Sequence, residues 1–325
     1  MRLLLGLAVL AFLGWSGWWW VASGTAQRGT DSTIASLQAQ GWQAGHDGLT
    51  VAGYPNRIDL TATAPRLATP DGRWGWSAPF VQIFALSYKP WHLIAAFAPD
   101  QRLHTPAGDW ALSADKMQAS LVLVPGADLT LDRFQLSATA PRLGGPLQAS
   151  ADSLALATRP TPDQALAHDI GLDLRGLVAD PVMLAALPPG LLPDHAALVR
   201  LDVVAAFDAP LDRHAATTPP RLTGLTLREV RGEWGPIRAH LTGRLVPDAA
   251  GYAEGALSLR MEGALAALEV AIAAGWLAPE ARATWAGVLT SLAPGGAALD
   301  LPLRLSRGRV SLGPLPLGPA PRLNW

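Results

Sequence analysis

The stretch at residues 57–67, Arg-Ile-Asp-Leu-Thr-Ala-Thr-Ala-Pro-Arg-Leu, returns at residues 133–143 as Arg-Phe-Gln-Leu-Ser-Ala-Thr-Ala-Pro-Arg-Leu, with eight of eleven residues identical. In the first copy Ile58, Leu60 and Ala62 are separated by polar residues. Such alternation puts apolar and polar side chains on opposite faces of a β-strand. The repeated stretch therefore predicts strands with one buried face and one face in water.

A second repeat lies between the copies of the first. The segment at residues 69–78 is similar to residues 105–114, and a fainter copy covers residues 147–152. Self-similarity at a fixed period of about 36 residues indicates a stacked supersecondary unit. Chance similarity in an alanine-rich chain is the alternative, and we favour a true repeat. Turn signals such as Pro70-Asp71-Gly72 separate the strands, and short connections predict an antiparallel meander.

The rest of the chain contains further strands and a few short helices. Asp31 would cap a short helix at residues 32–40, and Asp180 would cap the helix at 182–187. The Pro- and Gly-rich stretch at residues 313–318 is expected to be a linker or an edge strand. Residues 158–180 begin with a proline-containing break at residues 159–163, and we assign them to a junction. After it we expect helices at 182–187, 264–274 and 279–292, and strands at 198–207, 222–230, 237–246, 255–261, 301–305 and 309–312. The predicted fold class is mainly β with a few short helices, an elongated antiparallel β-sheet meander with internal repeats after one N-terminal transmembrane helix. We divide the chain into an anchor at 1–26, an N-terminal β-repeat region at 27–157 and a C-terminal β-rich region at 158–325.

The N-terminal segment is apolar enough to cross a membrane. No charged side chain occurs from Leu3 to Gln27, and about 20 apolar helical residues span the roughly 30 Å of bilayer hydrocarbon. Tryptophans gather at its far end, where indoles favour the headgroup level. The expected membrane-anchor residues are Leu3, Leu4, Leu5, Leu7, Val9, Leu10, Phe12, Leu13, Trp15, Trp18, Trp19 and Trp20.

The same segment also has features of a cleaved signal peptide, because Gly24-Thr25-Ala26 offers small residues for cleavage. The apolar run from Leu3 to Val21 is longer than the roughly 7–15 residues of a signal-peptide core, so we favour a retained anchor. Arg2 before the span favours a cytoplasmic N-terminus. We predict a single-pass inner-membrane protein with its body in the periplasm.

Composition excludes several function classes. The net charge of −1 gives no general attraction for nucleic acid, so we expect no nucleic-acid partner. The chain has no cysteine, which excludes disulfides, a lipidated N-terminal cysteine, thiolate metal sites and cysteine catalysis.

Histidine and serine patterns offer no further support for an enzyme. None of the seven histidines forms a His-x-x-x-His or Glu-x-x-His pair. No Gly-x-Ser-x-Gly or phosphate-binding glycine loop is present. We therefore expect no catalytic residue, no metal and no cofactor. A site assembled from distant residues stays open as an alternative.

The segment Gly53-Tyr54-Pro55-Asn56-Arg57 is the clearest candidate for a ligand or turn motif. Gly53, Tyr54, Pro55 and Arg57 would form a rigid turn that presents a guanidinium to an anionic headgroup or a partner carboxylate. The alternative, which we favour, is an Arg57 that pairs with a nearby acid such as Asp59 or Asp71 and holds the turn.

Four tryptophans form a second candidate. Trp74, Trp76, Trp91 and Trp110 would line a hydrophobic groove, although large aromatic side chains more often fill an ordinary core. We favour the core.

Several segments together resemble a known family. They are the apolar leader, the helix stop at Gly41, the opening at residues 51–57 and the ending Gly-Arg-Val-Ser-Leu-Gly-Pro-Leu-Pro-Leu-Gly at residues 308–318. The chain resembles the alphaproteobacterial domain-of-unknown-function family numbered 2125, which implies an envelope protein and no assigned activity. The segments at residues 243–251 and 255–259 are also similar to the C-terminal part of AsmA-like envelope proteins. That likeness implies an elongated β groove associated with lipid handling.

Two function hypotheses follow. The first is a non-enzymatic envelope protein that binds lipid or another amphiphile along an apolar β surface, with membrane lipid and other envelope proteins as partners. The alternative is a structural scaffold or protein-interaction module of the envelope without a small-molecule ligand. An envelope hydrolase is a third, weaker hypothesis. A continuous apolar groove, if left open, distinguishes the first hypothesis from the second.

Overall fold

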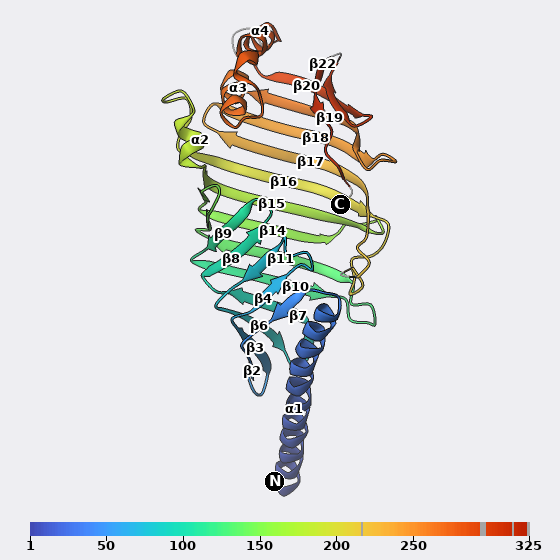
Figure 1. Cartoon of the computed structure of the whole chain (residues 1–325). Coiled ribbons are helices and arrows are strands. Elements are labelled where there is room, and N and C mark those ends of the chain that lie inside the picture. Colours follow the sequence, from blue (N-terminus) through green and yellow to red (C-terminus); the bar gives the residue numbers. More distant parts are fainter. Residues whose placement is uncertain (216, 293–296, 314, 324–325) are drawn as a thin grey trace.

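The computed structural model describes residues 1–215, 217–292, 297–313 and 315–323. One long helix leads into an extended antiparallel β-sheet, and short helices lie near the far end (Figure 1). The sheet has 22 strands. The predicted fold class, a mainly β elongated meander after an apolar helix, is therefore confirmed.

The leader is a single helix, α1, Arg2–Ala39, where we expected an anchor to residue 26 followed by a separate short helix. No proline interrupts this segment, and its alanine, leucine and glutamine residues favour continued helix. Asp31, the expected N-cap of the second helix, lies inside α1, and its carboxylate is 3.9 Å from His46. Gly41 follows the helix end with a φ of +86°, as expected for a left-handed stop.

Fifteen strands form one continuous layer, which we call the long layer. Each strand pairs antiparallel with the next in this order: β2 (Gly48–Ala52), β3 (Arg57–Thr63), β6 (Phe80–Leu86), β7 (Lys89–Phe97), β10 (Lys116–Leu123), β11 (Leu131–Thr139), β14 (Ser153–Pro160), β15 (Ala167–Val178), β16 (His195–Phe207), β17 (Leu222–Trp234), β18 (Ile237–Pro247), β19 (Ala253–Glu262), β20 (Leu299–Ser306), β21 (Arg309–Leu312) and β22 (Leu315–Pro319).

Seven shorter strands form a second layer, which we call the short layer. Its order is β1 (Gln43–Gly45), β4 (Arg66–Ala68), β5 (Gly75–Ser77), β8 (Asp100–Thr105), β9 (Gly108–Ser113), β12 (Arg142–Gly144) and β13 (Ala149–Ser150). The short layer joins the long layer where Ser150 pairs with Val178 of β15. In Figure 1 its arrows cross in front of the long strands of the N-terminal half.

The sequence repeat corresponds to one path taken three times. A long strand turns into two short strands and returns as a long strand, over β3–β6, β7–β10 and β11–β14. An alanine stands at each turn between layers, at positions 64, 78, 98, 114, 140 and 151. The matching residues Ala64 and Ala140 have left-handed φ values of +46° and +47°. Such values are uncommon for a residue with a side chain, so the repeated sequence reproduces an unusual backbone conformation.

The corner alanines allow the two layers to approach closely. Ala98 is 1% exposed and Ala114 is 3% exposed. Their turns are tied together by backbone hydrogen bonds, as where the amide of Ala114 donates to the carbonyl of Pro99 at 2.9 Å. A larger side chain at these corners would have to displace the opposite strand.

The second half differs from the expectation at one place. Residues 167–178, which we assigned to a junction, form the strand β15 in the middle of the sheet. Beyond it lie the short helices α2 (Pro181–Ala185), α3 (Ala264–Ala273) and α4 (Arg282–Leu292), with the 3-10 turn η1 (Pro279–Ala281) before α4. Asp180 caps α2 as predicted, because its carboxylate accepts from the amide of Val182 at 2.7 Å.

One buried cluster closes the C-terminal side of the sheet. The chain end packs against the strands there, and the buried members are Val203, Leu227, Leu245, Ala253, Leu305, Ala320 and Leu323. The strand β22 follows the edge position expected of the Pro- and Gly-rich ending, since it pairs with β21 at the end of the described order. Pro314 of that ending lies outside the described residues.

The corner alanines give a test of the two-layer fold. We expect Ala98→Leu to lower the free energy of unfolding by about 1–3 kcal/mol, because the extra atoms have no free volume at the turn. Ala155→Leu, on an exposed position of β14, is the matched control and should cost less than about 0.5 kcal/mol. Denaturant unfolding of the detergent-solubilised chain measures both. Equal losses would show that the corner is not tightly packed.

Candidate functional site

The long layer carries a continuous row of apolar side chains from its first strand to its thirteenth. We call this row the apolar ladder. Each member is the direct cross-strand partner of the next: Val51, Leu60, Ile83, Ala95, Ala119, Leu136, Leu156, Leu172, Leu201, Val230, Leu241, Leu259 and Leu301. Strands lie about 4.8 Å apart, so the twelve steps of the ladder span about 58 Å.

A second row beside the ladder is equally free of charge. Its cross-strand partners run from Ile58 on β3 to Leu312 on β21, with Thr158 and Gly243 as the interruptions. The other members are Ala85, Leu93, Leu121, Phe134, Ile170, Val203, Leu227, Leu257 and Leu303. Together the two rows make one face of the long layer an apolar strip.

The middle of this strip is only half-buried. Leu156, Leu172, Leu201, Leu241 and Leu259 all keep part of their surface accessible to solvent. The buried C-terminal cluster lies on this same face. Val203 and Leu227 of the second row belong to it, and Leu201, Val230 and Leu241 of the ladder pack against it. Half-exposed leucines in register over many strands are what an apolar ligand surface requires.

The opposite face of the long layer carries ion pairs. The carboxylate of Asp169 is 2.9 Å from the Arg228 guanidinium and 3.3 Å from Nε of Arg159. The carboxylate of Asp173 is 2.8 Å from Arg200 and 2.7 Å from Arg175. These charges hold that face in water, so the two faces of the same strands differ sharply in polarity.

The ion pairs also shift the pKa values of the two aspartates. Hydrogen bonds from Arg175 and Arg200 hold the pKa of Asp173 below its ordinary value. Partial burial raises the pKa of Asp169. Hydrogen bonds from Thr161 and Arg159, together with Arg228, lower it by more, so the net shift of the pKa is downward. Both carboxylates therefore stay ionised at neutral pH, as structural ion pairs do.

The short layer turns an apolar row toward the long layer. Leu67, Trp76, Leu103 and Trp110 are successive cross-strand partners. The Trp76 ring meets Phe97 of the long layer edge-on, with 6.3 Å between ring centroids. Side chains therefore fill the space between the layers in this half of the molecule.

The four tryptophans of the groove hypothesis separate in the structure. Trp76 and Trp110 are half-buried in the short layer, and Trp91 is half-buried in β7. Trp74 is 56% exposed. Trp76 and its partner Gln101 form a buried pair in which the indole donates to the amide oxygen at 2.9 Å. For Trp76 the core interpretation fits the observed packing.

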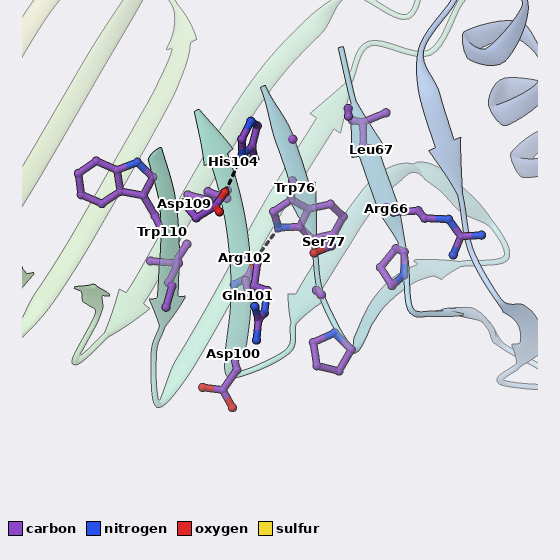
Figure 2. A pocket seen from close by; sticks show the side chains of 18 of the residues that line it. Arg66, Leu67, Trp76, Ser77, Asp100, Gln101, Arg102, His104, Asp109 and Trp110 are labelled. Carbon is purple, nitrogen blue, oxygen red and sulfur yellow. Dashed lines mark hydrogen bonds and ion pairs between the residues drawn. The ribbon is translucent and has the colours of Figure 1, made fainter. Parts of the chain in front are cut away.

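A concavity of about 1300 Å³ lies along the short layer (Figure 2). Its lining includes Arg66, Arg102, His104, Asp109 and Trp110 and contains no residue of a long strand. Charged side chains at its rim pair with each other, as His104 does with Asp109. It is a mixed polar trough, separate from the apolar strip.

The predicted turn motif lies at the tip of the β2–β3 hairpin, beside α1. Arg57 forms an ion pair of 2.6 Å with Asp59, which is the arrangement we favoured. Gly53 has a φ of +99°, and a side chain there would collide with the carbonyl of Arg57. The ring of Tyr54 meets Trp19 edge-on, at 5.3 Å between centroids. The motif thus connects the sheet to the leader helix.

The expected anchor residues lie on the half of α1 that precedes and reaches this hairpin. The helix is long and apolar enough to cross a membrane, and its N-terminal position also fits a signal sequence. Most of the expected residues are exposed in the structure, Leu3, Leu4 and Phe12 among them.

The structure groups no metal-ligating side chains in the part of the chain that it describes. No cluster of three or more histidine or acidic side chains suited to a metal ion occurs among those residues. His168 is the buried histidine, 5% exposed, with Phe207 against its ring at 6.4 Å between centroids. Burial lowers the pKa of His168, although the neighbouring Asp169 raises it in part.

The part of the strip on β15 differs from the expectation of a junction at residues 158–180. Ile170, Leu172 and Leu174 alternate there with Asp169, Asp173 and other polar residues. That alternation predicts a strand, whereas the prolines at 160 and 162 just before it indicate a break in regular structure.

The chain also matches a family model. The model is described as an uncharacterized protein conserved in bacteria (DUF2125), and it covers residues 19–321. No curated protein and no solved structure matches the chain.

His168 gives a prediction for the effect of pH. Because its pKa is lowered in the folded chain, the unfolded chain binds more protons as the pH falls below about 6.5. We expect the thermal midpoint to decline from that pH downward until the lowered pKa is passed. Scanning calorimetry of His168→Gln should show a shallower decline between pH 7 and 5. Thr50→Ala, at an exposed position of β2 without a titratable side chain, is the control and should keep the wild-type slope. An unchanged slope in His168→Gln would contradict the assignment.

Proposed function

The chain belongs to the DUF2125 family, and we propose that it is a non-enzymatic, membrane-anchored envelope protein that binds lipid acyl chains, or another amphiphile, along the apolar ladder. The observation that carries the proposal is the ladder itself, an uncharged row in register over thirteen strands and half-exposed in its middle. Apolar surface in contact with water is unfavourable by about 25 cal/mol per Å². A half-exposed strip of this kind therefore lowers the stability of a domain unless something covers it.

The length of the strip suits acyl chains. One leaflet of bilayer hydrocarbon is about 15 Å thick, half of the roughly 30 Å core. The ladder of about 58 Å is several times longer than that, so it has room for more than one chain end to end. No charged side chain interrupts either row of the strip.

The energetics favour reversible binding. Burying twelve methylenes contributes about 10 kcal/mol at about 0.8 kcal/mol per CH₂. Association costs of roughly 4–15 kcal/mol offset most of this gain. A lipid bound by one acyl chain would therefore exchange, whereas two chains on the same strip would be held tightly.

The leader helix supports a place at the membrane. Its apolar run and its tryptophan cluster fit a retained single-pass anchor, and Arg2 favours a cytoplasmic N-terminus. We infer an inner-membrane protein whose β body lies in the periplasm. Membrane lipid is then at hand as the ligand, and other envelope proteins are further candidate partners.

A scaffold role without ligand is the second candidate, and one observation favours it for the N-terminal half. There Trp76 packs on Phe97, and Nε2 of Gln101 lies 3.3 Å from the sulfur of Met117, so side chains occupy the space between the layers. The strip from β14 to β20 has no such cover from the short layer in the described chain, because that layer ends at β13.

Photocrosslinking at neighbouring positions of β14 tests the lipid proposal. We expect benzoylphenylalanine at Leu156, on the strip, to crosslink ³²P-labelled phospholipid in living cells. The same group at Ala155, on the opposite face of the same strand, is the matched control and should give at most background labelling. Equal labelling at both positions, or none at Leu156, would favour the scaffold.

A charge in the strip should remove the ligand without removing the fold. We expect Leu172→Asp, at a half-buried ladder position, to lower the lipid recovered with the purified full-length chain at least tenfold, because an acyl chain would have to desolvate the carboxylate. Ala157→Asp, on the opposite face, should leave recovery unchanged. Mass spectrometry of the organic extract measures lipid per protein, and circular dichroism verifies that both variants keep their strands.

A further inference from the structure

We propose that the β body itself contacts the bilayer, through the tips of the β2–β3 and β6–β7 hairpins. We call this seating surface the tip surface, and its residues are Tyr54, Pro55, Tyr88 and Lys89. Its partner is the phospholipid headgroup layer on the body's side of the membrane. The inference rests on the proposed anchor and adds where the apolar strip begins relative to the bilayer.

Hydrogen bonds fix the height of the tips along α1. The indole of Trp15 donates to the carbonyl of Pro55 at 3.0 Å, and the indole of Trp19 donates to the carbonyl of Arg57 at 2.6 Å. The indole of Trp18 donates to the carbonyl of Ser87 at 3.4 Å, in the β6–β7 turn. Three successive anchor tryptophans are thus tied to both hairpin tips.

A side-chain contact adds to these backbone contacts. The hydroxyls of Ser16 and Tyr54 lie 2.8 Å apart. The indole hydrogen bonds also explain why three polar N–H groups occur in an apolar helix: each has a carbonyl partner on the sheet. The tips cannot move along the helix without leaving these donors unpaired.

The helix before this attachment is too short to cross a bilayer alone. Residues 2–14 of α1 precede Trp15, and thirteen helical residues extend about 20 Å. Bilayer hydrocarbon is about 30 Å thick. If the tryptophans lie at the headgroup level, the tips lie there too. If the whole apolar run is immersed, the tips lie deeper still.

The chemistry of the tips suits the headgroup layer. Tyr54 is 45% exposed and Tyr88 is 60% exposed, and tyrosine is enriched at membrane interfaces. Lys89 follows Tyr88 and is one of the two lysines of the chain. An exposed lysine beside the bilayer is attracted to anionic headgroups.

The position of the tips places the start of the apolar strip at the lipid surface. In Figure 1, β2 and β3 lie closest to the free part of α1, and α3 and α4 lie at the other end of the sheet. Ile58 and Leu60 belong to the strip and to the strand that begins at the tip. Ile58 and Leu60 themselves are buried, so an acyl chain leaving the bilayer would first reach the strip at half-exposed leucines such as Leu156, beyond the strands that the short layer covers.

Single-cysteine labelling tests the inference, because the chain has no cysteine of its own. Full-length Tyr88→Cys and Lys89→Cys carry a nitrobenzoxadiazole label in phosphatidylethanolamine–phosphatidylglycerol vesicles that contain lipid with a nitroxide near the headgroup. We expect both labels to be quenched at least threefold more than a label at Ser258→Cys, an exposed position of β19.

A label at Leu10→Cys, read in vesicles whose lipid carries its nitroxide on the acyl chain, separates the two proposals, because residue 10 belongs to the proposed membrane span. Quenching at residue 10 without quenching at 88 and 89 would keep the anchor and overturn the tip surface. No quenching at residue 10 would overturn the anchor, and the tip surface with it. Quenching at residues 10, 88 and 89 but not at 258 is the result that the inference predicts.

Discussion

Cross-strand register is the constraint on which the rest of this structure depends. A strand that slips by one residue exchanges its two faces, so an apolar strip across thirteen strands requires every pairing to be in register. The bulge in β17 shows that this register is kept even where a strand is irregular. Leu227 and Val230 are three residues apart, which in a regular strand would put them on opposite faces, and the register shift between them returns Val230 to the strip.

The two layers divide the molecule into a filled half and an open half. Where the repeats run, small corner residues such as Ala98 and Ala114 let the short layer fold back, and Trp76 fills the interior. Beyond β15 the long layer continues without that cover. The filled half gives rigidity to the attachment at α1, while leucines such as Leu156 and Leu172 in the other half stay half-buried.

The two faces of the long layer differ in polarity. Ion pairs around Asp169 and Asp173 keep one face of the sheet in water, and the other face carries no charge along its two central rows. The indoles of α1 join the first hairpins to the helix. These contacts fix the orientation of the sheet relative to α1, which a flexible linker would have left undefined.

The sequence by itself determined the class of the fold, the leader helix and most of the strands, because these depend on local periodicity. The alternation from Ile58 to Ala62 and its copy at residues 133–143 are enough to predict half-buried strands, and Asp180 is enough to predict a helix start. The sequence did not determine that Asp31 would lie inside a continuous helix, or that residues 167–178 would be central in the sheet. Nor could it pair Leu156 with Leu172 and Leu172 with Leu201, because register depends on backbone hydrogen bonds between strands. Only the tertiary structure assembled scattered leucines into one strip, and only it brought Pro55 and Ser87 to the tryptophans of α1, since those contacts join segments separated by about 40 to 70 positions in the chain.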